Sequence, residues 1–269
     1  MTRIAATVTV VLGTMLLPGS VGAQWPDRPA IGIPRTPDGK PDLSARLPAG
    51  PDGRPDLSGI WLPDPGSAGT KGIGESLRSP YFVDVTSDLD PAKVPFQPWA
   101  EAQYRRHRER NMMDDPTARC QPTGVPALDT YPFPFKVLQL RGLVVILYEN
   151  NTDFRQIFID GREAPRDPTP TWMGYSVGKW EGDTLVVESI GFNDRSWLDR
   201  SGHPHSESLR VIERFRRMDV GRMEITITID DPKTYTGPIT FTQAQKLLPD
   251  AELLEHFCTD NEKSSQHFQ

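Results

Sequence analysis

Histidine and acidic side chains gather in one stretch of the chain, residues 194–207. Asp194, Asp199, His203, His205 and Glu207 all lie there, whereas the other three of the five histidines lie elsewhere. Imidazole and carboxylate groups together can perform acid–base catalysis or bind a metal ion. This stretch is therefore the first candidate for chemistry.

His203, His205 and Glu207 occupy alternate positions, so an extended backbone would direct all three to one side. Two histidines and a carboxylate can bind Zn²⁺ or Fe²⁺, although this spacing is less specific than the helical His-Glu-x-x-His pattern. Without a metal, His205 could act as a base that Asp199 or Glu207 orients. The stretch could equally be a polar surface loop with turn hydrogen bonds from Ser206 and Glu207.

Apolar and polar residues alternate from Phe135 onward, which indicates β-strands. The expected strands are 136–140, 143–148, 152–159, 173–180, 184–190, 208–218, 222–229 and 239–244, with a further one possible over 247–257. Short turns with glycine at 142, 182 and 221 join several of them. The fold class is all-β: an antiparallel meander, closed into a barrel or folded as a sandwich.

Three predicted strands carry a charge on the apolar face. Arg155 shares its face with Ile157 and Ile159, Glu188 with Val186 and Ile190, and Glu213 with Leu209, Val211 and Phe215. A lone buried ion costs several kcal/mol, so each charge must be paired or must line a wet cavity.

Three explanations for these charges remain open. A β-bulge could reset the register so that they face water, or Arg155 and Glu213 could form a buried structural pair. Alternatively, they line a ligand cavity together with Glu188, Trp180 and Phe215. In such a cavity Glu213 could act as a general acid or base, as pocket carboxylates with a raised pKa do.

Residues 1–23 have the pattern of a secretory signal. Arg3 precedes an apolar run from Ile4 to Leu17, and small residues end at Ala23, the expected cleavage point. The run is short for a membrane span, and no other segment approaches that length. The sequence predicts export to the periplasm or medium, with no transmembrane segment in the mature form.

Residues 24–97 form a proline- and glycine-rich arm with a tandem repeat at 37–44 and 51–58, each copy reading Pro-Asp-Gly-Lys/Arg-Pro-Asp-Leu-Ser. Pro-Asp-Gly is typical of a turn. The arm could wrap around the body of the protein or dock onto an envelope partner. The body is expected over 98–262, beginning with a short helix at 98–111 and followed by a tail at 263–269.

Cys120 and Cys258 are the only cysteines. In an oxidising compartment they predict one disulfide between the start of the strand region and the C-terminal segment. A reactive thiol or a metal-binding pair is the alternative.

Composition and motifs exclude several classes of function. The net charge is −6, the sequence pI is about 5.4, and the basic residues are dispersed, which argues against a nucleic-acid partner. The chain has no glycine-rich phosphate loop and no strand–helix alternation of the dinucleotide-binding kind. Kinase and dehydrogenase chemistry are therefore poorly supported.

Several long motifs carry a resemblance: Gly178–Val187, Phe192–Arg217 and the Asp-Pro-x-x-Arg-Cys-Gln-Pro-x-Gly-Val-Pro run at 115–126. They resemble an uncharacterised family of exported bacterial proteins, and this resemblance implies no activity. More loosely, Gly59-Ile60-Trp61 ahead of a meander is similar to the start of lipocalin-like barrels, which implies a barrel that holds apolar molecules.

These observations lead to three hypotheses. The first is an exported barrel that binds a small, largely apolar molecule bearing a polar or anionic group, oriented by Arg155 and Glu213. The second is a hydrolase or lyase that uses the 194–207 loop. The third is a structural envelope module that docks through its arm.

Overall fold

A computed structural model describes residues 32–50, 52–64 and 83–260. The predicted signal peptide and the predicted C-terminal tail lie outside these residues, as does part of the arm. No helix in the described ranges is long and apolar enough to cross a membrane.

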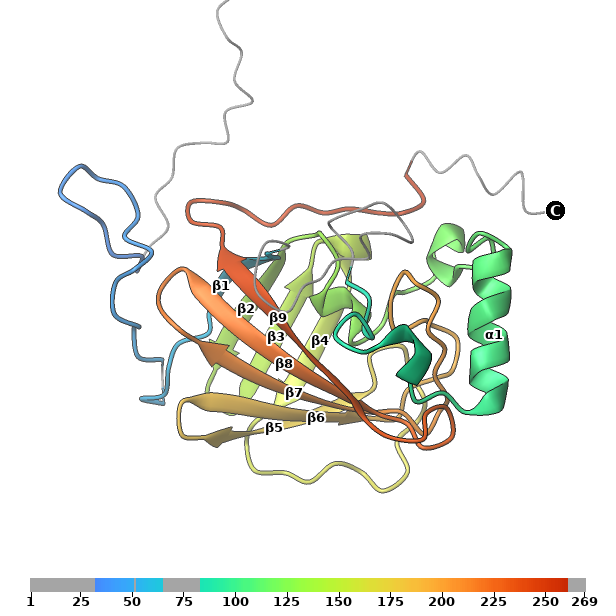
Figure 1. Cartoon of the computed structure of the whole chain (residues 1–269). Helices are drawn as coiled ribbons and strands as arrows, with labels where there is room; N and C mark the ends of the chain where they lie inside the picture. The colour runs from blue at the N-terminus through green and yellow to red at the C-terminus, as the bar shows by residue number, and fades with distance from the viewer. Residues whose placement is uncertain (1–31, 51, 65–82, 261–269) are drawn as a thin grey trace, which may run out of the picture.

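Nine strands form one closed barrel in chain order, and the last strand pairs with the first (Figure 1). The strands are β1 (Gly59–Pro63), β2 (Phe135–Leu140), β3 (Leu143–Tyr148), β4 (Phe154–Phe158), β5 (Tyr175–Glu181), β6 (Thr184–Ile190), β7 (Arg210–Arg217), β8 (Arg222–Asp230) and β9 (Ile239–Leu247). The predicted all-β barrel is confirmed, and the sandwich is excluded.

Short helical elements accompany the strands. They are the α-helix α1 (Pro98–Glu109) and the 3₁₀ turns η1 (Pro91–Lys93), η2 (Pro116–Arg119), η3 (Ala127–Asp129) and η4 (Asn150–Thr152). Helix α1 begins at a proline whose missing N–H needs no partner there. It stands beside one end of the barrel, and the two arm repeats lie at the other end (Figure 1).

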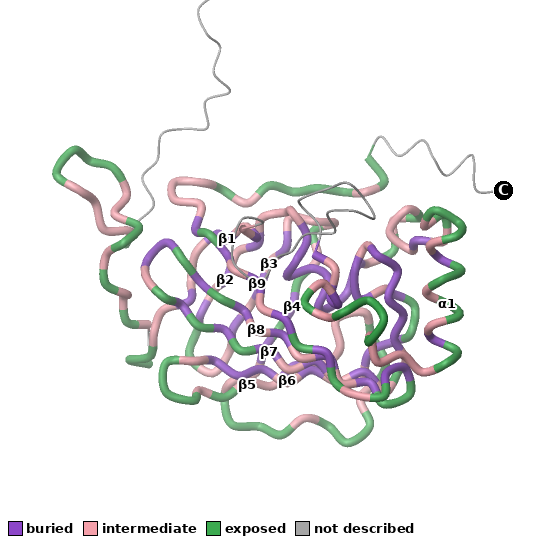
Figure 2. Tube along the Cα trace, in the orientation of Figure 1, coloured by how far each residue is buried: buried purple, intermediate pink, exposed green. Residues whose placement is uncertain are grey.

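Side chains alternate between the inside and the outside of the barrel along each strand, and the inward ones fill it. In β8, Met223, Ile225, Ile227 and Ile229 are fully buried, and the residues between them face outward. Buried and exposed segments alternate in the same way along neighbouring strands (Figure 2). The core is therefore the packed inside of the barrel.

Strand β1 closes the barrel by pairing with both β2 and β9. Its Trp61 is fully buried, and the indole N–H donates to the carbonyl of Leu57 over 3.0 Å. The segment 24–97 thus supplies a barrel strand in addition to an arm.

One pair of strands departs from the expected antiparallel pattern, because β4 and β5 are parallel. They pair at only two positions, Ile157 with Ser176 and Phe158 with Val177. The connecting segment, 159–174, contains several prolines, which lack the N–H that a strand ladder needs. This connection returns the chain to the end of the barrel at which β4 begins, so β5 runs in the same direction as β4. The prediction of a purely antiparallel meander is therefore wrong at this seam between β4 and β5.

The two arm repeats form tight turns that contact the barrel. Gly39 and Gly53 take the left-handed conformation, with φ of 82° and 76°. Leu43 accepts a hydrogen bond from the Gly221 N–H, and Arg54 donates to the carbonyl of Gly182. The two repeats therefore lie on the turns at one end of the barrel.

The segment after β9 is fastened by a disulfide and contains no strand. Cys120 and Cys258 are bonded, with their Cα atoms 5.4 Å apart, as the sequence predicted. The possible strand at 247–257 is wrong, because β9 itself extends to Leu247 and residues 248–260 have no strand partner. A disulfide is typical of an oxidising, extracytoplasmic compartment.

Candidate functional site

Arg155 and Glu213 both lie inside the barrel and bond to each other. Their side chains are 1% and 0% exposed, and both guanidinium Nη atoms donate to the Glu213 carboxylate. Arg155 also donates to Ser176 over 3.1 Å and to Ser189 over 2.8 Å. The Nη1 atom of Arg155 also lies 3.5 Å from Asp129 Oδ2. All five N–H donors of this guanidinium are therefore occupied by the protein.

Asp129 adds a second carboxyl to this buried cluster. Tyr148 donates to Asp129 over 2.8 Å. Burial, and then the negative charge of Glu213, raises the pKa of Asp129 well above its usual range. A proton held between the two carboxyls leaves one net negative charge facing Arg155. The cluster matches the buried structural pair that was one of the open explanations.

Glu188 faces outward, which corrects the predicted face of β6. The inner face consists of Leu185, Val187 and Ser189, so Val186 and Glu188 lie outside. Arg210 donates to the Glu188 carboxylate over 2.8 Å, and this hydrogen bond lowers the pKa of Glu188. Glu188 therefore takes no part in an interior site.

The two aromatic residues predicted for the interior are both packed in it. Phe215 is 2% exposed, and Trp180 is half-buried against the same core. The Trp180 indole N–H is enclosed without a hydrogen-bond partner in the described structure. These residues fill space inside the barrel and do not line the cleft described below.

The 194–207 loop separates the residues that alternation would have placed together. Residues 203–206 do not form a strand, and the chain turns at Glu207 and Ser208. His203 and His205 are buried with different partners, and Glu207 is exposed. The predicted metal set of His203, His205 and Glu207 is not assembled.

His203 instead joins Asp199 and Asp84. The Nδ1 atom of His203 lies 2.8 Å from Asp199 Oδ2, and ligand atoms of all three residues lie within 4.8 Å of one another. Burial lowers the pKa of His203, but the charge and hydrogen bond of Asp199 outweigh it and raise that pKa. This group could hold a metal ion.

The same three residues also form a complete hydrogen-bonded group without an ion. The Asp199 carboxylate accepts from the backbone N–H groups of Val85, Ser201 and His203. A metal would have to displace the proton shared by the imidazole and Asp199. These three side chains could therefore bind a cation. Their geometry fits equally well a hydrogen-bonded Asp–His pair that holds two loops together.

His205 contacts Ser196, and neither Asp199 nor Glu207 orients it. The His205 Nε2 atom lies 2.9 Å from Ser196 Oγ, and Nδ1 lies 3.2 Å from the carbonyl of Ser206. Burial lowers the pKa of His205, which keeps the imidazole neutral. Ser196 and His205 are both buried, at 6% and 4% exposed, so this pair is closed to solvent.

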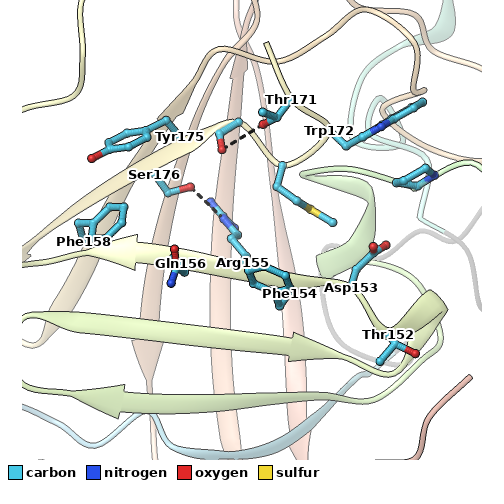
Figure 3. Close-up of a pocket in the computed structure, with 13 residues that line it drawn as sticks. Thr152, Asp153, Phe154, Arg155, Gln156, Phe158, Thr171, Trp172, Tyr175 and Ser176 are labelled. Atoms are coloured by element: carbon cyan, nitrogen blue, oxygen red, sulfur yellow. Dashed lines mark hydrogen bonds between the residues drawn. The ribbon is translucent and has the colours of Figure 1, made fainter. Parts of the chain in front are cut away.

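An open cleft of about 500 Å³ lies where β4 and β5 diverge. Its walls are largely apolar and come from both strands and from the end of their connection. The lining includes Phe154, Phe158, Trp172, Met173 and Tyr175 (Figure 3). Arg155 also borders the cleft, but its guanidinium turns inward to Ser176 (Figure 3).

Asp153 is the acidic residue of this cleft, and it precedes β4 directly. Its Oδ2 atom is enclosed and has no hydrogen-bond partner among the described residues. Burial raises the pKa of Asp153 to about 6. Sequence analysis missed this residue, because an acid after Asn150-Asn151 is typical of an ordinary turn.

Replacing Asp153 by Asn should stabilise the protein at pH 7.5. The folded-state pKa of about 6 exceeds the usual value near 3.9, so ionisation costs stability above pH 6. Part of the side chain is exposed to water, so we expect a gain of about 1–2 kcal/mol. Urea unfolding should show this gain at pH 7.5 and little of it at pH 3.5, where the carboxyl is protonated in both states. A gain of equal size at both pH values would contradict the explanation.

No protein-family model matches the chain, and no curated protein matches it either.

Proposed function

We propose that this protein binds a small, largely apolar molecule in the cleft between β4 and β5. The supporting observation is the seam itself, because two strands that pair at only two positions leave one gap in an otherwise continuous wall. The volume of about 500 Å³ falls within the range of about 300–1,000 Å³ that is usual for small-molecule sites.

The lining of the cleft supports an apolar ligand. Phe154 is 61% exposed there, although a phenyl ring on a strand is ordinarily covered. A bound molecule would cover this ring together with Trp172 and Met173. The buried Arg155–Glu213 pair would then stabilise the barrel behind the cleft without contacting the ligand.

The 194–207 loop does not favour hydrolase or lyase chemistry over binding. Asp199, His203 and His205 are buried, and each is bonded within the protein. A substrate could reach them only after the loop had moved. A metal at Asp84, Asp199 and His203 would join two loops in the same way as the hydrogen bonds do.

A titration with Nile red, a neutral fluorescent dye, tests the proposed binding. Phe154→Ala removes the exposed ring of the cleft, and Phe257→Ala removes a ring that is 44% exposed on the C-terminal segment. We expect Phe154→Ala to weaken dye binding about five- to tenfold, since partial burial of a phenyl ring contributes about 1–1.5 kcal/mol. Phe257→Ala should leave binding unchanged. Equal effects of the two substitutions, or no binding to the unmodified protein, would contradict the proposal.

A further inference from the structure

The carboxylate in the cleft has no partner within the described structure. Asp153 is half-buried and lines the cleft, and its enclosed Oδ2 atom accepts no hydrogen bond there. Leaving a buried polar oxygen unpaired costs free energy, more so when it is charged. Unpaired groups of this kind in a native protein require an explanation, and a missing ligand group is one.

The neighbouring cation does not neutralise this carboxylate. Arg155 borders the same cleft, but its donors go to Glu213, Asp129, Ser176 and Ser189. No charge–charge effect accompanies the burial that raises the pKa of Asp153. The cleft therefore offers a carboxylate that no cation among the described residues neutralises.

Aromatic rings surround the cleft and are suited to a positive charge. The face of an aromatic ring attracts cations. Two of the lining rings already attract one each: the Arg162 guanidinium lies 3.9 Å from the centre of Phe158, and that of Arg195 lies 4.6 Å from the centre of Trp172. Arg162 is itself paired with Asp160, which reduces its repulsion of a further cation.

We infer that the cleft takes a small amine, whose ammonium group donates to Asp153 while its apolar part lies against Phe154, Trp172 and Met173. This inference rests on the proposed function, because it names the chemical class of the ligand for that cleft. It replaces the anionic group expected from Arg155 with a cationic one. Figure 3 shows Asp153 and Trp172 bordering the same side of the cleft.

Three probes of the same shape test the inference: 2-phenylethylamine, 2-phenylethanol and 3-phenylpropionate. Calorimetric titration of the full chain at pH 7.5 compares an ammonium, a hydroxyl and a carboxylate on one phenyl group. We expect the amine to bind about tenfold or more tighter than the alcohol, because a charge-assisted hydrogen bond is stronger than a neutral one. The carboxylate should bind most weakly, since it would face Asp153.

Two variants test whether Asp153 causes the preference for the amine. Asp153→Asn keeps the shape of the side chain and should reduce amine affinity to that of the alcohol, while alcohol affinity stays the same. Asp167→Asn is the matched control, because Asp167 is an exposed acid in the β4–β5 connection that does not line the cleft. It changes the net charge equally and should leave both affinities unchanged. Equal amine and alcohol affinities, or an amine affinity insensitive to Asp153→Asn, would overturn the inference.

The pH dependence gives an independent check. Amine affinity should fall between pH 7.5 and 5.0 as Asp153 gains a proton, since its pKa is about 6, and alcohol affinity should not. Among the described residues, the other charged groups around the cleft are Arg155 with its two carboxyls, the Arg162–Asp160 pair and Arg195. The imidazole of His256 lies nearby, and its Nδ1 accepts from the Asn151 N–H over 3.4 Å. Asp153→Asn tests the assignment, because the pH dependence should disappear in that variant and would persist if another group caused it.

The outcomes also separate this inference from the proposed function. If Nile red binding depends on Phe154 but the amine shows no advantage, the cleft binds apolar molecules and the amine inference is wrong. If neither the dye nor any phenyl probe binds, both are wrong.

Discussion

Replacing Arg155 by Met is expected to lower the free energy of unfolding by about 3–5 kcal/mol. The substitution removes the cation that faces two buried carboxyls, Asp129 and Glu213, and leaves Ser176 and Ser189 bonded only to each other. Those carboxyls would have to take up protons or admit water, and both cost stability in a closed core. Guanidinium chloride unfolding measures the loss.

Arg210→Met is the matched control for this prediction. Arg210 also lies on a strand and pairs with a glutamate, Glu188, but about two fifths of each side chain is exposed to water. Exposed pairs of this kind contribute about 0–1 kcal/mol. A second variant, Arg155→Met with Glu213→Leu, removes both partners and should recover part of the loss. If Arg155→Met were no worse than Arg210→Met, the buried cluster would not stabilise the barrel as described.

Loss of the disulfide is expected to lower the free energy of unfolding by about 4–5 kcal/mol. The bond between Cys120 and Cys258 closes a loop with a sequence separation of 138, so reduction restores much freedom to the unfolded chain. Chemical unfolding of the variant with both cysteines replaced by Ser measures this effect. The unmodified protein under reducing conditions should behave like the variant. Unfolding midpoints that are the same before and after reduction would contradict the prediction.

Local patterns were sufficient to predict eight of the nine strands, β2 to β9, whereas β1 was not among the expected strands and the possible strand at 247–257 was wrong. Alternation over Met223–Ile229 identifies β8 correctly, because one face is apolar at every second residue. The glycines at 142 and 182 take left-handed conformations in the predicted hairpin turns. Barrel closure was predicted as one of two outcomes, since alternation alone is compatible with a barrel and with a sandwich.

Strand direction and the correct face of β6 could not be predicted. A period of two contains no information on whether a strand runs parallel to its neighbour, so the β4–β5 seam was missed. Val186 and Ile190 suggested an apolar inner face that included Glu188, but Val186 is buried on the outer side of the barrel. An apolar residue is therefore weak evidence of which face of a strand points into the barrel when both faces are partly covered.

The candidate site depended on geometry that sequence spacing does not specify. The alternation of His203, His205 and Glu207 implies a common side only in extended backbone, and the chain turns at Glu207. Asp84 reaches His203 from a distant part of the chain. The cleft depends on how two strands diverge, so Asp153 and Phe154 could be recognised only after the barrel had been placed.

The closure of the barrel has a consequence for the rate of folding. Trp61 in β1 pairs with Leu247 in β9, so the first and last strands meet to complete the wall. Contacts between residues this distant in sequence form late, because a long loop must lose its entropy before any contact compensates for it. Until then, β1 and β9 are sheet edges that can pair with another chain. A high contact order therefore predicts slow refolding and the greatest risk of aggregation in the interval before the first and last strands pair.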